Sequence, residues 1–263
     1  MGLKETKIYW ENEAIKRIQD SNEDLFHDYW TKRYIDNLKY LKSGNRILDI
    51  GCGDAKYFIK LKNEYNEFHG IELSEIHFET AKKLFPSGNY IVTDANELPF
   101  ENCFFDTIIS FGAFEHNEDI GNIFKECYRV LNNGGILLFS VPNYYSTYFP
   151  YLYIYNKLKG YDIGASIGYN YSMSYLKFNL KKAGFKNIKT VDTIYASPLP
   201  ISGAIKRLFN NLTNLNIFKR KKNEYAEREK IMHKSINKYN ADRIFYPLEY
   251  MGLGFMRVIY CEK

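Results

Sequence analysis

The chain has 263 residues, of which 45% are hydrophobic and 25% charged, a balance typical of a globular domain rather than a disordered or fibrous one. Its net charge of +5 does not by itself indicate a nucleic-acid partner. The four cysteines lack Cys-x-x-Cys or metal-ligand spacing, so we expect neither a disulfide framework nor a metal site. The sequence contains no signal peptide and no apolar run of about 18 residues, and we therefore expect a cytoplasmic protein.

Two helices are expected before the first strand. Apolar residues recur at helical spacing over residues 6–18 and again over residues 25–41, where Ser43-Gly44 follows. Three aromatic residues of the second helix either pack it against a sheet or approach a ligand, and these are Tyr29, Trp30 and Tyr34.

The segment Arg46–Ala55 predicts a strand, a tight turn and the start of a helix. Gly51 and Gly53 permit a sharp turn and let a ligand approach the main chain, whose free N–H groups carry partial positive charge. A dinucleotide fingerprint would need a glycine where Lys56 stands. Asp49 would repel a pyrophosphate but suits a ligand that carries an ammonium group. The turn therefore indicates a nucleoside site for a cationic ligand.

The next two predicted strands each end near a carboxylate. Residues 68–74 contain Glu72, about 20 residues beyond the glycines, the spacing at which a carboxylate accepts hydrogen bonds from ribose hydroxyls. A helix from Ser74 to Leu84 follows. Residues 90–95 predict a short strand whose Asp94 either contacts the ligand or caps a short helix.

The chain then alternates between strand and helix patterns once more. Residues 104–111 predict a largely buried strand, and residues 112–117 follow its carboxyl end. A helix is expected over residues 120–131, stopped by the turn residues 132–135, and a fifth strand over residues 136–143.

Taken together, residues 46–143 resemble the class I S-adenosylmethionine-dependent methyltransferases. The first motif of that family, Asp-x-Gly-x-Gly-x-Gly, is matched from Asp49 to Ala55 except that alanine replaces the last glycine. Arg129 to Gly135 is similar to the family's connection before the fifth strand. The resemblance implies a Rossmann-like α/β fold, with a doubly wound seven-stranded sheet that is parallel except for its last strand, and S-adenosylmethionine as cofactor.

The resemblance also implies which residues form the site. It places the cofactor against Asp49, Gly51, Cys52, Gly53, Glu72, Leu73, Asp94, Ala95, Ser110 and Phe111. His116 is the candidate base for a hydroxyl or acidic carbon, with Glu115 orienting it or binding acceptor hydroxyls, although the histidine could instead only pack beside the cofactor. The absence of an Asn-Pro-Pro-Tyr run disfavours adenine and glutamine-amide acceptors. We therefore expect a small-molecule acceptor methylated at oxygen or carbon.

Four parts are expected along the chain. They are helices over residues 1–45 that roof the cofactor, a core over residues 46–195 and 251–263, a tyrosine-rich lid within it over residues 144–172, and an insertion over residues 196–250. A helix over residues 174–183, a sixth strand over 185–191 and a seventh over 255–261 complete the core.

The insertion carries the basic run Lys219–Lys222. It is either a solvated helical excursion, a dimer arm in a protein that is a monomer or homodimer, or a basic face that rests on a membrane or an acidic acceptor.

Two rival functions stay open. One is a module that binds S-adenosylmethionine without turnover, for which Ala55 is the hint. The other is a nicotinamide oxidoreductase, which Asp49 and Lys56 disfavour.

Overall fold

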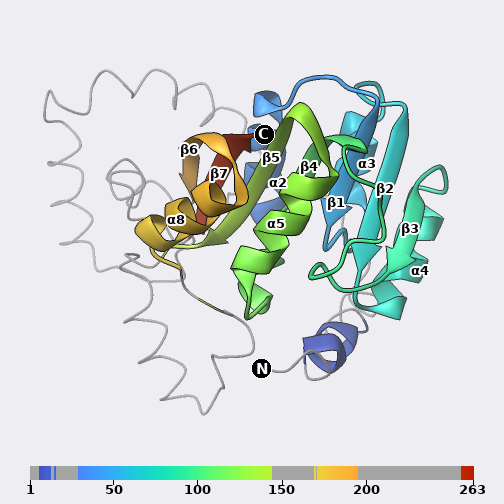
Figure 1. Cartoon of the computed structure of the whole chain (residues 1–263). Helices are drawn as coiled ribbons and strands as arrows, with labels where there is room; N and C mark the ends of the chain where they lie inside the picture. Colours follow the sequence, from blue (N-terminus) through green and yellow to red (C-terminus); the bar gives the residue numbers. More distant parts are fainter. Residues whose placement is uncertain (1–5, 13–14, 16–28, 144–168, 170, 195–255) are drawn as a thin grey trace, which may run out of the picture.

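The computed structural model describes residues 6–12, 15, 29–143, 169, 171–194 and 256–263 (Figure 1). Most of the expected lid and the whole expected insertion lie outside these residues, as does the link between the first two expected helices.

The described strands form one seven-stranded sheet in the order β3-β2-β1-β4-β5-β7-β6. Their bounds are β1 Arg46–Ile50, β2 Glu67–Glu72, β3 Asn89–Val92, β4 Phe105–Ser110, β5 Leu131–Pro142, β6 Lys186–Ile194 and β7 Met256–Glu262. β7 is antiparallel to both of its neighbours, whereas every other neighbouring pair is parallel. This arrangement confirms the predicted doubly wound α/β architecture, and it puts the carboxyl ends of β1 to β5 at the same edge of the sheet.

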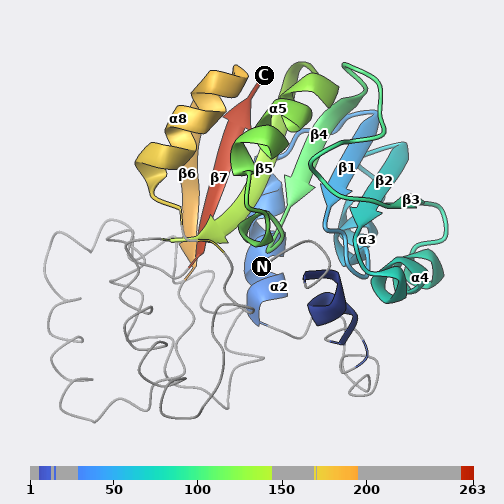
Figure 2. The same cartoon turned by 60° about the horizontal axis from the view of Figure 1, so that its bottom comes forward.

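Helices cover both faces of the sheet (Figures 1 and 2). Residues 6–12 are helical and are called the N-terminal helix below. The other described helices are α2 Tyr29–Asn37, the short η1 Leu38–Tyr40, α3 Lys56–Leu61, α4 Glu75–Leu84, the short η2 Phe114–His116, α5 Ile120–Val130 and α8 Met173–Ala183. Side chains of α5 and α8 pack on one face, and those of α2, α3 and α4 on the other.

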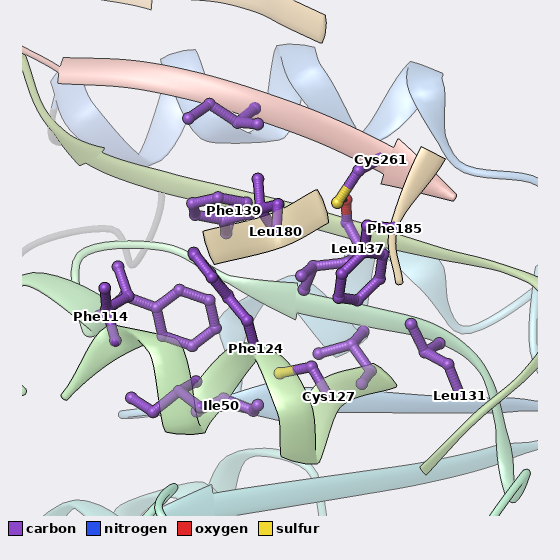
Figure 3. Close-up of a cluster of buried hydrophobic side chains, with 14 of the residues drawn as sticks. Ile50, Phe114, Phe124, Cys127, Leu131, Leu137, Phe139, Leu180, Phe185 and Cys261 are labelled. Carbon is purple, nitrogen blue, oxygen red and sulfur yellow. The ribbon is translucent and has the colours of Figure 1, made fainter. Parts of the chain in front are cut away.

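The core divides along the sheet because alternate strand residues point to opposite faces. In β5, Leu137 and Phe139 join the cluster under α5 and α8, while Leu138 joins the cluster under α2 and α3. Figure 3 shows Phe124 of α5, Phe139 and Leu180 of α8 pointing into the first cluster. The apolar spacing that predicted α5 thus marks its buried face.

One predicted boundary is wrong. Residues 132–135 were expected to form a turn, but β5 begins at Leu131, which pairs with Phe105 before the register shifts. Main-chain hydrogen bonds to Lys263 hold the glycines of this segment. Gly134 N–H donates to the Lys263 carbonyl (3.2 Å), and Lys263 N–H donates to the Gly135 carbonyl (3.0 Å). Gly134 keeps a positive φ of +78°, and the pairing with β4 passes from Leu131 to Ile136, so residues 132–135 form an irregularity inside the bounds of β5.

A buried ion pair attaches α2 to β6. Arg33 Nη2 donates to both carboxylate oxygens of Asp192, at 3.1 and 3.2 Å, and both side chains are nearly inaccessible to solvent. Asn37 Nδ2 donates to the same carboxylate at 2.9 Å. Tyr34, one turn before Leu38, stacks on Phe111 with ring centroids 4.7 Å apart, which favours the packing alternative for this aromatic residue.

No helix among the described residues is both long and apolar enough to span a bilayer.

Candidate functional site

The turn after β1 has three residues with positive φ: Gly51 at +73°, Gly53 at +53° and Ala55 at +57°. A Cβ on Gly51 would lie 2.5 Å from the Ala113 Cβ, whereas a Cβ on Gly53 would meet nothing within 4 Å. Gly51 is therefore needed for close packing, while Gly53 leaves main chain open to a ligand. Ala55 occupies the left-handed region just before α3, so the turn keeps its shape without the last glycine of the motif.

Glu72 connects the end of β2 to this turn. Its Oε2 accepts a hydrogen bond from Gly53 N–H at 3.0 Å, and its Oε1 accepts from the main chain of Leu73 (2.8 Å) and Ser74 (3.1 Å). These bonds hold a partly exposed carboxylate beside the glycines. Glu72 therefore lies against the glycine turn, and its role toward ribose hydroxyls stays a prediction.

Asp49 lies beneath the turn with only 1% of its surface exposed. Neither of its carboxylate oxygens has a hydrogen-bond partner among the described residues. Burial raises the pKa of Asp49 well above its usual value, the negative charges of Glu72 and Asp54 raise it further, and Lys56 opposes them. A buried acceptor without a donor costs free energy unless a partner arrives, and a cationic ligand would supply that partner.

Asp94 follows β3 at the same edge of the sheet. Its Oδ1 accepts from Asn96 N–H (3.2 Å) and its Oδ2 from the Asn96 side chain (2.9 Å), so it holds a turn rather than capping a described helix. Asn122 of α5 donates to the Asn96 carbonyl at 2.7 Å. Because Glu72 pairs with Val92, the last residue of β3, Asp94 follows two residues beyond the level of Glu72.

The loop after Asp94 is held by Arg129, a residue whose role the sequence did not indicate. Its guanidinium donates to the carbonyls of Leu98 (2.8 Å) and Phe100 (2.7 Å), and it is held in turn by Glu126. Such a fork of donors fixes a loop at several points at once. The motif resemblance pointed to Arg129, but only the folded loop reveals what it binds.

Three of the predicted cofactor residues use their side chains for packing. The Ser110 hydroxyl donates to the Ile50 carbonyl at 2.9 Å, and the Phe111 ring packs against Tyr57 as well as Tyr34. The thiol of Cys52 is buried against Gly70. The side chains of these three residues are thus engaged within the protein.

Glu115 and His116 lie in η2, which follows Ala113 and thus adjoins the glycine turn. In the described part of the chain, Glu115 Oε2 and His116 Nδ1 are buried without a hydrogen-bond partner. Burial raises the pKa of Glu115 to about 8 and lowers the pKa of His116 to about 4. At neutral pH the imidazole is therefore uncharged, and most Glu115 carboxyls are protonated.

The described residues contain no cluster of His, Cys, Asp and Glu that could hold a metal ion. The glycine turn, the orphaned carboxylate of Asp49 and the anchored carboxylate of Glu72 instead fit the adenosyl ligand with a charged ammonium group that the motif predicted.

A model of the methyltransferase domain family matches residues 48–139. The chain is 34% identical over 111 residues to a demethylmenaquinone methyltransferase of Thermotoga maritima, covering 41% of this chain and 48% of that protein. It is 30% identical over 135 residues to the 27-O-demethylrifamycin SV methyltransferase of Amycolatopsis mediterranei, covering 44% of this chain and 50% of that protein. The chain thus spans about half the length of these curated relatives.

Among solved structures, the fold is similar to a Thermotoga maritima S-adenosylmethionine-dependent methyltransferase, described as a possible histamine N-methyltransferase. The TM-score is 0.58 and the sequences are 25% identical, with 75% of this chain and 89% of that chain covered.

Proposed function

We propose that this protein methylates a small-molecule acceptor at oxygen or carbon. The premise is that the domain matched at residues 48–139 belongs to the class I S-adenosylmethionine-dependent methyltransferase family. The observation that carries the proposal is the buried, unpartnered carboxylate of Asp49 beneath a glycine turn that Glu72 anchors. Relatives named for demethylmenaquinone and demethylrifamycin support a small-molecule acceptor.

S-adenosylmethionine, when bound, supplies a methyl group on an electron-poor sulfonium. Asp49 would hold the ammonium group of this cofactor, Glu72 its ribose hydroxyls and Asp94 its adenine amino group. The space where a Gly53 side chain would lie is open to the ligand, and the Gly53 N–H is held by Glu72. The protein's main contribution is then to align the acceptor and exclude water.

The proton of a hydroxyl or acidic-carbon acceptor needs a base. The neutral imidazole of His116 can accept that proton at pH 7, although its lowered pKa makes it a weaker base than a free histidine. Glu115, protonated in most molecules at that pH, would donate a hydrogen bond to an acceptor oxygen. We assign His116 as the base and Glu115 as the acceptor-binding residue.

A binding module without turnover is the second candidate, and Ala55 with its φ of +57° is the observation that favours it. Alanine at a left-handed position carries strain that glycine would not. The nicotinamide oxidoreductase is disfavoured by the family assignment.

Two measurements test these proposals. Calorimetry should detect binding of S-adenosylmethionine to the full chain and none of NADH, and Asp49→Asn should weaken the former at least tenfold. Formation of S-adenosylhomocysteine with extracts or candidate quinone and phenol acceptors then separates an enzyme from a silent module. The silent module would be favoured if the native protein binds S-adenosylmethionine but shows no turnover in any extract, and if Ala55→Gly restores turnover.

A further inference from the structure

The N-terminal helix makes two contacts with distant parts of the sheet edge. Lys7 Nζ lies 2.8 Å from Glu75 Oε1 at the start of α4, which follows β2. The Trp10 ring meets the His116 imidazole edge to face, with centroids 5.0 Å apart and planes at 78°. Lys7 and Trp10 are three residues apart and so lie on one face of the helix.

These contacts place the helix over the glycine turn. β1 lies between β2 and β4 in the sheet, and the two anchor points follow β2 and β4. Strands two places apart are separated by about 10 Å, and a helix of seven residues is also about 10 Å long. The helix can therefore bridge the carboxyl end of β1, and Figure 2 shows it, in dark blue, at this edge of the sheet.

His116 contacts the N-terminal helix through Trp10. Its Nδ1 is buried without a hydrogen-bond partner in the described part of the chain, and the Trp10 ring is in contact with the imidazole. Among the described residues, several ionisable groups stand on the surrounding elements. They are Lys7, Tyr9 and Glu11 of the N-terminal helix, Glu115, Glu118 and Asp119 between β4 and α5, and Tyr169 and Tyr171. Burial, and none of these charges, lowers the pKa of His116 to about 4.

We propose that Trp10 is a positioning residue for His116: its indole shields the imidazole from water and holds the ring at the carboxyl edge of the sheet. The consequence for turnover rests on the proposed role of His116 as the base. The shielding itself does not, because it can be measured in the protein without acceptor or cofactor.

The direct test is an NMR titration of the full chain labelled at histidine, with His116→Gln identifying the signal. The native signal should titrate with a midpoint near 4. Trp10→Ala should move the midpoint up by at least one pH unit, toward the ordinary histidine value, whereas Trp10→Phe, which keeps an aromatic cover, should move it less. Ile8→Ala is the matched control, because Ile8 is half exposed on the same helix, and it should leave the midpoint unchanged.

Fluorescence gives a second readout. The chain has two tryptophans, so Trp30→Phe leaves Trp10 as the sole tryptophan, whose emission is excited at wavelengths that the tyrosines do not absorb. A protonated imidazole quenches a neighbouring indole. We therefore expect the Trp10 emission to fall as the pH is lowered through the same midpoint near 4, and we expect no such step in His116→Gln. Both Trp30→Phe and His116→Gln keep Trp10 in place, so this test can be made even if Trp10→Ala does not fold.

An unchanged midpoint in folded Trp10→Ala, an equal shift in Ile8→Ala, or emission without a step that depends on His116 would overturn the proposal. Cofactor binding, measured separately by calorimetry, decides the proposed function. A protein that binds no S-adenosylmethionine but shows the expected titration would refute the methyltransferase and leave the shielding role intact.

Discussion

The methyl group of Ala113 lies where a side chain on Gly51 would have to go, since a Cβ on Gly51 would be 2.5 Å from the Ala113 Cβ. This contact joins the turn after β1, where the cofactor is proposed to bind, to the segment after β4 that carries Glu115 and His116. The shape of the turn and the position of the candidate catalytic residues are therefore coupled.

Gly51→Ala should destabilise the protein by about 2–5 kcal/mol. The left-handed backbone accounts for about 1–2 kcal/mol of this loss, and overpacking against Ala113 for about 1–3 kcal/mol. The free energy of unfolding in urea measures the total.

Gly53→Ala is the matched control, because φ is also positive there but the new Cβ meets open space. It should show the backbone loss alone. The double variant Gly51→Ala/Ala113→Gly should recover the overpacking part. Equal losses in Gly51→Ala and Gly53→Ala would contradict the proposed contact.

Cofactor binding should release a proton from Asp49. Burial holds the pKa of this carboxyl well above its usual value in the free protein, and a bound ammonium group would lower it. The complex then binds fewer protons than the free protein, so affinity should rise with pH, by up to about tenfold per unit, until the free protein is itself deprotonated. Calorimetry in two buffers of different ionisation enthalpy counts the proton released.

Asp49→Asn should abolish this proton release while weakening binding, because the amide does not titrate. The opposite result would contradict the prediction. If the affinity of the native protein for S-adenosylmethionine falls as the pH rises toward the pKa of Asp49, Asp49 does not face the cation.

Glu115 should make the protein less stable at alkaline pH. Its pKa is raised from 4.5 to about 8 by burial, so between these values the folded state binds more protons than the unfolded state. The free energy of unfolding therefore decreases as the pH rises through this window, by up to about 5 kcal/mol for the full shift. Glu115→Gln should remove this decrease. The free energy of unfolding of the variant minus that of the native protein should therefore be larger at pH 9 than at pH 5.

The variant His116→Gln is the control for this slope. His116 has a lowered pKa, so its own contribution is lost as the pH falls from about 6.5 to about 4, in the opposite direction. Parallel stability curves for Glu115→Gln and the native protein between pH 5 and 9 would refute the buried, uncompensated carboxyl.

The sheet could be predicted from sequence because its signals are local. Apolar runs bounded by turn signals marked the positions of strands, and the family resemblance supplied their seven-stranded arrangement. The spacing of Glu72 from the glycines indicated a place beside the same ligand. Ser74 likewise marked the start of α4, where its hydroxyl accepts from His77 N–H at 3.3 Å.

Contacts between distant residues could not be predicted in this way. Trp10 contacts His116 although more than a hundred residues separate them in the sequence, and neither residue type indicates its partner. Asp106 of β4 is a second example, because its Oδ2 accepts from the main chain of Asn45 (2.7 Å) and Arg46 (3.0 Å). Such roles depend on which loops the sheet order brings together.

The buried pair of Arg33 and Asp192 is another such contact, and it gives the last prediction. Asp192→Ala removes the carboxylate from a guanidinium that stays buried, and it should destabilise the protein by about 3–5 kcal/mol. The double variant Arg33→Met/Asp192→Leu replaces both charges with apolar groups and should lose much less, since neither desolvated charge remains. Unfolding in urea compares the two variants. A double variant no more stable than Asp192→Ala would mean that the pair itself, rather than the avoidance of a lone buried charge, secures α2 to β6.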